Sequence, residues 1–413
     1  MVRRMACMAA LAAATVGLSA WAVAAAGTPS AEPTAHDPHY ESSAWKGVAE
    51  KGAFRRETWP AARLLVWARP GEDGNLDQAE NWLEDGKPAQ AAPDAETDIL
   101  LPSAGKEYRV GGSSKSVRME VRHVTVGANA FLTPYRYSVR GNAWVQAGGS
   151  IGSGHAAGVA GERHTFFRND NGPMWESEGR LARLARIGQY MGIMKSKGAS
   201  CEFIGQMWTT DELGVKEGTC VLSEGSGLLG GPNSSQMVGP GATLVLLSGS
   251  RFGKQQNKIS GNVDIVIQGE MLVGTPERPI TDDVILGVSY KDLREDPLLH
   301  GFKVMPTGKV RIVSADPTKA RLVLKWHGLV QARPRNEPDK YDALPRTISV
   351  LLQGDVELDG VLFDDVRKGG IVLEDLAVRS RWKHVFFGPN NAAAPDELFS
   401  RYEPPPKPRA AWM

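Results

Sequence analysis

Cysteine is scarce in this chain of 413 residues, which has only Cys7, Cys201 and Cys220. No histidine stands near the last two at metal-ligand spacing, and the chain has no HExxH sequence and no EF-hand loop. We therefore expect no metal and no cofactor. If Cys7 leaves with the N-terminal segment, Cys201 and Cys220 remain as a pair. Two interpretations are open for them: a disulfide with Cα atoms about 4.4–6.8 Å apart, or two small buried side chains.

An excess of charge of one sign is also missing. The chain has 48 Lys and Arg against 47 Asp and Glu, which gives a formal net charge of +1. Proteins that bind nucleic acids present a basic stripe that displaces counterions from phosphate groups. No such stripe stands out in this sequence, so we expect no nucleic-acid partner.

Long apolar runs are absent after the first 26 residues, where nothing approaches the roughly 18 apolar residues that span a bilayer. At the N-terminus, Arg3 and Arg4 precede an apolar run, and Ala24, Ala26 and Gly27 form a small-residue cleavage site. This order is typical of a secretory signal peptide. We expect a secreted protein, extracellular or periplasmic, without a retained transmembrane segment; a retained membrane anchor is the competing interpretation.

Tight hairpin signals are few as well. Asp-Gly occurs only at 73–74, 85–86 and 359–360, and Asn-Gly only at 171–172. In contrast, the chain has 46 Gly and 26 Pro, and these punctuate short runs rich in β-branched residues. This combination predicts an all-β chain rich in turns.

The stretch GEMLVGTPERPIT, residues 269–281, breaks a strand at Gly274, Pro276 and Pro279, and the strand pattern resumes at once. A wide corner of this kind suits a chain that turns onto a new face and does not fold back in a hairpin. With the scarcity of hairpin signals, it favours a right-handed parallel β-helix over the alternative, a β-sandwich. One short helical insertion is expected over 180–194, where RLARLARIGQYMGIM has apolar residues at spacings of three and four.

These patterns divide the chain into six predicted segments. They are a signal peptide (1–26), a flexible linker (27–62), a first β region (63–154), an insertion with one helix (155–198), parallel β-helix rungs (199–400) and a Pro-rich tail (401–413).

The first β region resembles the G8 domain of extracellular and cell-surface proteins, a β module that often stands beside parallel β-helix repeats. The matching residues are Trp67, Asn81-Trp82, Pro93, Asp98 to Pro102, the strand HVTVG that ends at Gly127, and LVGTPERPI. The last element lies about 150 residues beyond HVTVG in this chain, whereas it follows soon after in the family. The resemblance implies an extracellular, carbohydrate-linked context, and no catalytic residue is carried over from it.

The candidate binding residues are Lys325, Trp326, His327, Asp364 and Asp365. In LVLKWHGL, Lys325 and His327 share one strand face, and Trp326 lies on the other. Asp364-Asp365 follows the apolar run GVLF, and coils of roughly 20–30 residues would bring these acids beside Trp326. The plainer interpretation is a core tryptophan and a solvated turn. The pair Asp282-Asp283 and the histidine in WKHVFF, His384, show similar patterns.

The predicted partner is an extracellular polysaccharide, because flat aromatic rings beside polar groups suit sugar faces. Two alternatives remain open: a polysaccharide depolymerase, a lyase or glycoside hydrolase on the same scaffold, and a structural surface protein. The catalytic residues are unknown, and whether the chain is an enzyme is uncertain. The sequence does not identify the glycan, the oligomeric state or whether a bond is cleaved.

Overall fold

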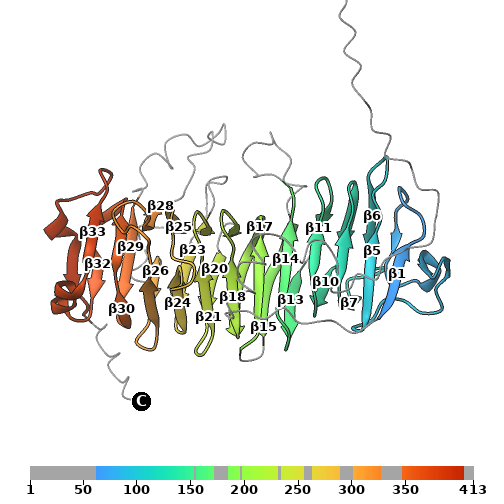
Figure 1. The fold of residues 1–413 in the computed structure, drawn as a ribbon, viewed down its shortest axis with the longest axis horizontal. Helices are drawn as coiled ribbons and strands as arrows, with labels where there is room; N and C mark the ends of the chain where they lie inside the picture. Colours follow the sequence, from blue (N-terminus) through green and yellow to red (C-terminus); the bar gives the residue numbers. More distant parts are fainter. Residues whose placement is uncertain are drawn as a thin grey trace, which may run out of the picture.

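The computed structural model describes residues 62–152, 155–171, 185–195, 198–230, 234–254, 263–288, 301–326 and 347–403. This part of the chain is all-β, with strands arranged in long parallel sheets. Its helices are single 3-10 segments, η2 (Ala79–Asn81), η4 (Leu376–Arg381) and η5 (Pro395–Leu398). Figure 1 shows an elongated stack in which chain order runs from one end to the other.

The strands fall into three rows. The first row contains β1 (Arg63–Trp67), β5 (Thr97–Leu101), β8 (Val124–Val126), β11 (Ala143–Val145), β14 (Thr165–Asn169), β16 (Ser200–Ile204), β18 (Thr219–Leu222), β21 (Thr243–Leu246), β24 (Glu270–Val273), β27 (Lys309–Ile312) and β30 (Asp355–Glu357). Strands β3 (Trp82–Glu84) and β4 (Lys87–Pro88) add to its N-terminal edge in antiparallel orientation. All other pairs in this row are parallel.

The second row contains β2 (Gly74–Asn75), β6 (Tyr108–Gly111), β9 (Ala130–Thr133), β12 (Ser150–Ile151), β19 (Gly227–Gly230), β22 (Arg251–Lys254), β25 (Val284–Val288), β28 (Leu322–Trp326), β31 (Asp359–Phe363) and β33 (Lys383–Phe387). The third row contains β7 (Arg118–Val121), β10 (Arg136–Val139), β13 (Ala156–Gly161), β20 (Ser234–Val238), β23 (Val263–Ile267), β26 (Phe302–Val304), β29 (Ile348–Leu352), β32 (Val366–Leu373) and β34 (Phe399–Arg401). Two long strands, β15 (Ala185–Lys195) and β17 (Gln206–Glu217), contribute to both rows; the first part of β17 pairs with β19 and its later part with β20.

The chain visits the three rows in turn, and each circuit, here called a coil, stacks on the previous one. Thus β8, β9 and β10 pair in parallel with β11, β12 and β13 one coil later. The parallel pairing excludes the antiparallel sandwich for the described residues and is consistent with a β-helix or another solenoid. The first row also runs without interruption across the predicted boundaries at 154 and 198.

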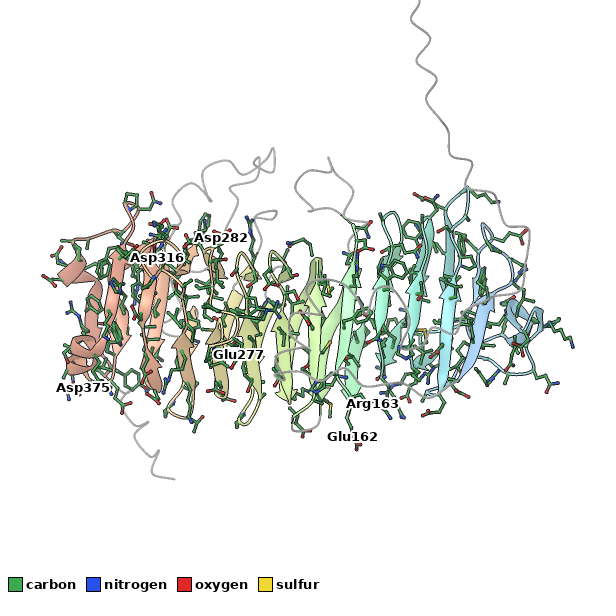
Figure 2. All side chains as sticks on the ribbon, in the orientation of Figure 1. Glu162, Arg163, Glu277, Asp282, Asp316 and Asp375 are labelled. Atoms are coloured by element: carbon green, nitrogen blue, oxygen red, sulfur yellow. The ribbon has the colours of Figure 1, made fainter. Side chains whose placement is uncertain are left out.

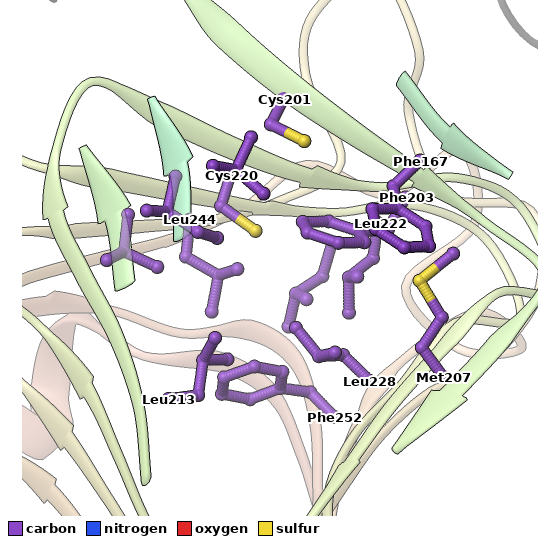
Figure 3. Packing of buried hydrophobic residues seen from close by; sticks show 14 of the residues in the cluster. Phe167, Cys201, Phe203, Met207, Leu213, Cys220, Leu222, Leu228, Leu244 and Phe252 are labelled. Atoms are coloured by element: carbon purple, nitrogen blue, oxygen red, sulfur yellow. The ribbon is translucent and has the colours of Figure 1, made fainter. Parts of the chain in front are cut away.

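The core fills the space between the rows with stacked side chains of similar type. Phe167 and Phe203 stack with ring centroids 5.9 Å apart, and Leu222 follows in the next coil (Figure 3). Because neighbouring residues of a strand point to opposite faces, Val221 and Val245 lie on the outer face of the first row. They are nevertheless buried, in a small apolar cluster with Leu247. The first row is therefore buried on both faces at this point.

Cys201 and Cys220 are register neighbours on β16 and β18, so the predicted proximity is confirmed (Figure 3). Both are free thiols in the structure and both are buried. Neighbouring strands lie roughly 4.7–4.9 Å apart, whereas the Cβ atoms of a disulfide lie about 3.5–4.5 Å apart. Burial raises the pKa of the Cys201 thiol to about 11. The second interpretation, two small buried side chains, therefore describes this pair.

The predicted corner after β24 is confirmed. Gly274 has a φ of +74°, and a Cβ placed there would lie 2.3 Å from the carbonyl oxygen of Val313. Only glycine fits this backbone approach. The chain then turns through Thr275 and Arg278, whose backbone amides each donate to the other's carbonyl oxygen, and resumes as β25.

The predicted helix over 180–194 is wrong from Ala185 onward, and residues 180–184 lie outside the described part. The segment Ala185–Lys195 is strand β15, which pairs in parallel with β13 on one side and β17 on the other. Gly188 and Gly192 weaken a helix. Because helix propensity is a weak preference, backbone pairing with two neighbouring strands overrides the helical spacing of the apolar residues.

Candidate functional site

The structure places Trp326 at the end of β28, on the face that points into the core. Its ring is half-buried and packs against the core, and its register neighbour in the previous coil is the buried Val288. Lys325 precedes it and therefore points outward. His327 lies outside the described residues. The core tryptophan, the plainer of the two interpretations of the sequence, agrees with this placement.

We expect the substitution Trp326→Ala to lower the free energy of unfolding by roughly 2 kcal/mol, less than the about 3–5 kcal/mol of a fully buried aromatic ring. The reason is the loss of packing against the core, and the loss is smaller because the ring is only partly buried. Urea denaturation measures the change. An unchanged unfolding midpoint, together with weaker polysaccharide binding, would instead assign the ring to the surface.

Asp364 and Asp365 form the corner between β31 and β32. Asp365 has a φ of 57°, and its Oδ2 accepts a hydrogen bond of 3.2 Å from the backbone amide of Trp326. Asp364 accepts hydrogen bonds from the backbone amide and the side-chain Nδ2 of Asn390, at 3.3 and 3.1 Å. The structure thus brings both acids next to the end of β28, as predicted, although one coil here spans 39 residues, from Leu322 to Val361, and not roughly 20–30. Both carboxylates accept hydrogen bonds from residues of neighbouring coils.

An elongated surface on the second row connects some of these residues, and we call it the outer patch. The pairing of β28 with β31 ends at Leu324 and Phe363, so Lys325 and Asp364 each directly follow a paired residue on neighbouring coils. Alternation along β28 points Lys325 outward. An apolar stripe runs parallel to them across four strands, because Ile285, Val323, Leu362 and Phe386 are successive register neighbours. Val323 is buried, and the other three side chains are partly exposed. The outer patch consists of these residues with Asp283, Arg321, Asp359 and His384 along the other side of the stripe.

Paired ionic groups form that side of the outer patch. Arg321 donates two hydrogen bonds to Asp283, of 3.2 and 2.9 Å, and this pairing raises the pKa of the guanidinium. The same guanidinium lies 5.6 Å from the ring centroid of Phe386. His384 Nδ1 lies 2.6 Å from the Asp359 carboxylate. The neighbouring corner residues Asp282 and Asp316 lie along one edge of the molecule in Figure 2.

The outer patch combines a flat apolar strip, one aromatic ring and fixed hydrogen-bonding groups on rigid strands. Sugar rings present apolar C–H faces and a rim of hydroxyl groups, so such a surface has both kinds of contact they need. Sequence reasoning did not select Phe386 or Arg321 as binding residues. The available signal was alternation in KHVFFG and ARLVLKW, which separates inward from outward residues once one core position is known.

A second notable group is Glu202, whose carboxyl is buried on the outer face of the first row. Ser223 Oγ donates to Glu202, and Arg278 Nη1 lies 3.9 Å from Glu202 Oε1. Arg278 also donates to Glu224, with Nη2 2.6 Å from Oε1. Burial raises the pKa of Glu202 to about 7, against the opposing effects of Ser223 and Arg278. Since only 1% of Glu202 is exposed, it does not contact a ligand in this state.

No group of three His, Cys, Asp or Glu side chains in the described ranges has the geometry of a metal site. Within the same ranges, no helix has the length and apolar character needed to cross a membrane. Comparison of the chain with protein-family models, with curated proteins and with solved structures gave no match. The resemblance to the G8 domain therefore stays a prediction.

Proposed function

We propose that this chain is a secreted, right-handed parallel β-helix that recognises an extracellular polysaccharide through the outer patch. The observation that carries the proposal is the apolar stripe from Ile285 to Phe386, flanked on both sides by polar and charged side chains. The parallel rows support the β-helix, and the N-terminal sequence supports secretion. A polymer with repeating sugar faces is the kind of ligand that a stripe extending over several coils fits.

Binding without cleavage is the form of recognition that the outer patch favours. Its three acids are already engaged: Asp283 with Arg321, Asp359 with His384, and Asp364 with Asn390. A glycoside hydrolase needs one carboxylic acid that donates a proton and a second carboxylate that is free to act as base or nucleophile. Carboxylates held by cations or amides are poorly suited to these roles. We therefore favour polysaccharide binding over depolymerisation as the function of the outer patch.

The outer patch predicts that Phe386→Ala and Arg321→Gln each weaken polysaccharide binding about tenfold, which corresponds to about 1.4 kcal/mol. The first variant removes the ring that contacts sugar faces, and the second removes a donor and its cation–π contact with that ring. Affinity electrophoresis in gels with embedded polysaccharides measures the change, and a reducing-end assay on the same polymers detects cleavage.

Matched controls are available on other surfaces. Leu376 is 42% exposed on η4, and Arg311 is ion-paired to Asp355 on the outer face of the first row. Leu376→Ala and Arg311→Gln should leave binding unchanged. Equal losses in the control variants, or full binding by Phe386→Ala, would contradict the assignment to the outer patch. Release of reducing ends by the wild-type protein would establish the depolymerase alternative.

A further inference from the structure

Four side chains gather near the N-terminal end of the stack, at the corner between the second and third rows. Lys115 lies in the connection from β6 to β7, and Arg118 is the first residue of β7. One coil later, Tyr135 stands just before β10, and Arg136 is its first residue. The three cations are exposed, and Tyr135 is half-buried. This corner is also the one that Lys325 and Asp364 border further along the stack.

The positions of the two arginines are electrostatically unfavourable in the free protein. Arg118 and Arg136 are direct register neighbours on parallel strands, and like charges in that relation destabilise a sheet. Neighbouring strands are only about 4.7–4.9 Å apart. Both guanidinium groups can therefore reach the same group of a ligand. Side chains that repel one another in the free protein gain most from a ligand that carries negative charge.

The ion pairs of the region leave part of this charge unbalanced. Glu120 Oε1 lies 3.0 Å from Arg118 Nε, and Glu120 Oε2 lies 3.9 Å from Arg140 Nη2. Arg140 also pairs with Glu96 at 3.5 Å. Throughout the described ranges, no acidic side chain forms an ion pair with Lys115 or Arg136. Of the three cations at this corner, only Arg118 therefore has a carboxylate partner within the described residues, and that carboxylate, Glu120, also lies near Arg140.

The unbalanced cations converge on one aromatic ring. Lys115 Nζ and the Arg136 guanidinium carbon each lie 6.0 Å from the ring centroid of Tyr135. His155 packs edge-on against the same ring, with centroids 5.4 Å apart. The ring thus has a fixed position, with two cations over it and a third one coil away. A sugar with an anionic substituent needs a flat surface for its ring and cations for its charge.

We propose that Lys115, Arg118 and Arg136, arranged around Tyr135, form a subsite for the anionic groups of an acidic polysaccharide. Carboxylate and sulfate share the relevant chemistry, because each presents two or more oxygens that a guanidinium binds bidentately. The proposal rests on the proposed function and narrows it from polysaccharides in general to those with negative charge. Dissociation constants for polygalacturonate, dextran sulfate and neutral dextran test it and separate the two anions.

The wild-type protein should bind at least one acidic polymer more than about tenfold tighter than dextran, with affinity that falls as salt increases. The double variant Arg118→Gln/Arg136→Gln should lose about tenfold or more of that affinity. Arg118→Lys/Arg136→Lys keeps the charge without the bidentate geometry, so its affinity should lie between the two. Lys309→Gln/Lys319→Gln removes the same charge from exposed sites elsewhere and should bind like wild type.

Several outcomes would overturn the subsite: equal affinity for dextran and both acidic polymers, equal losses in the Lys309/Lys319 control, or unchanged binding by Arg118→Gln/Arg136→Gln. A melting temperature near that of wild type shows that each variant is folded. Failure of the outer patch is a separate result. It appears as full binding by Phe386→Ala, whereas failure of the subsite leaves Phe386→Ala impaired and the arginine variant intact.

Discussion

Replacing Asp98 by alanine should lower the free energy of unfolding by about 3–5 kcal/mol. Asp98 on β5 accepts a hydrogen bond of 2.6 Å from Arg122 Nε and a second from Arg122 Nη2. The side chains of Arg122 and Asp98 are only 4% and 1% exposed. Removal of the carboxylate takes away the negative charge that neutralises the buried guanidinium, and the uncompensated desolvated cation is the main cost.

A second Asp–Arg pair of the same bidentate form provides the control. Asp283 and Arg321 are 29% and 25% exposed, so water solvates the remaining guanidinium after Asp283→Ala. Urea denaturation should show a loss of at most about 1 kcal/mol for this variant. If Asp98→Ala and Asp283→Ala lower the free energy of unfolding equally, burial does not determine the strength of the Asp98–Arg122 interaction, and the expectation is wrong.

Replacing Glu202 by glutamine should remove a pH dependence of stability. In the folded state the pKa of Glu202 is raised to about 7 from an ordinary value of 4.5, mainly by burial. A carboxyl with a raised pKa contributes its full stability below pH 4.5 and loses it as the pH rises through 7. At pH 8 the ionised carboxyl should therefore cost roughly 3 kcal/mol relative to acidic solution.

Glutamine imitates the protonated acid at every pH and keeps an oxygen for the hydrogen bond from Ser223. We expect Glu202→Gln to be more stable than wild type at pH 8 and similar to it at pH 5. Glu224→Gln is the control, since Glu224 contacts the same Arg278 but its side chain is 47% exposed. Thermal unfolding between pH 5 and 8 measures both. A difference between Glu202→Gln and wild type that does not vary with pH would refute the burial argument.

Composition and punctuation predicted the all-β class and the wide corner at Gly274, because a close backbone approach requires glycine whatever the surroundings. Residues 185–194 were misassigned, since spacings of three and four in ARIGQYMGIM also fit a strand once two neighbouring strands supply hydrogen bonds. Pairing with neighbouring strands is a tertiary interaction that outweighs the local helical pattern, and a single sequence does not reveal it.

The sequence predicted only part of the candidate site, because it does not show which residues of a strand face the core. Asp364 and Asp365 lie beside the end of β28 as predicted, but the coil that separates them from it is 39 residues long and not roughly 20–30, because the connection after β28 is longer than expected. The sequence LVLKW alternates, but alternation does not say which set of residues faces the core, because the outward Val323 is as apolar as the inward Leu324. Only the register with Val284, Leu286 and Val288 shows that Trp326 belongs to the inward set. Phe386 was overlooked because adjacent Phe386 and Phe387 look alike in sequence, although one points outward and the other inward.

Hydroxyl-radical footprinting with and without the tightest-binding polymer tests most directly whether the outer patch binds polysaccharide. We expect Phe386, Leu362 and His384 to become less reactive when the polymer is bound. Met194, which is 52% exposed on the third row, and Leu376 on η4 should react equally in both states. Unchanged reactivity at Phe386 and Leu362 under saturating polymer would contradict polysaccharide binding at the outer patch.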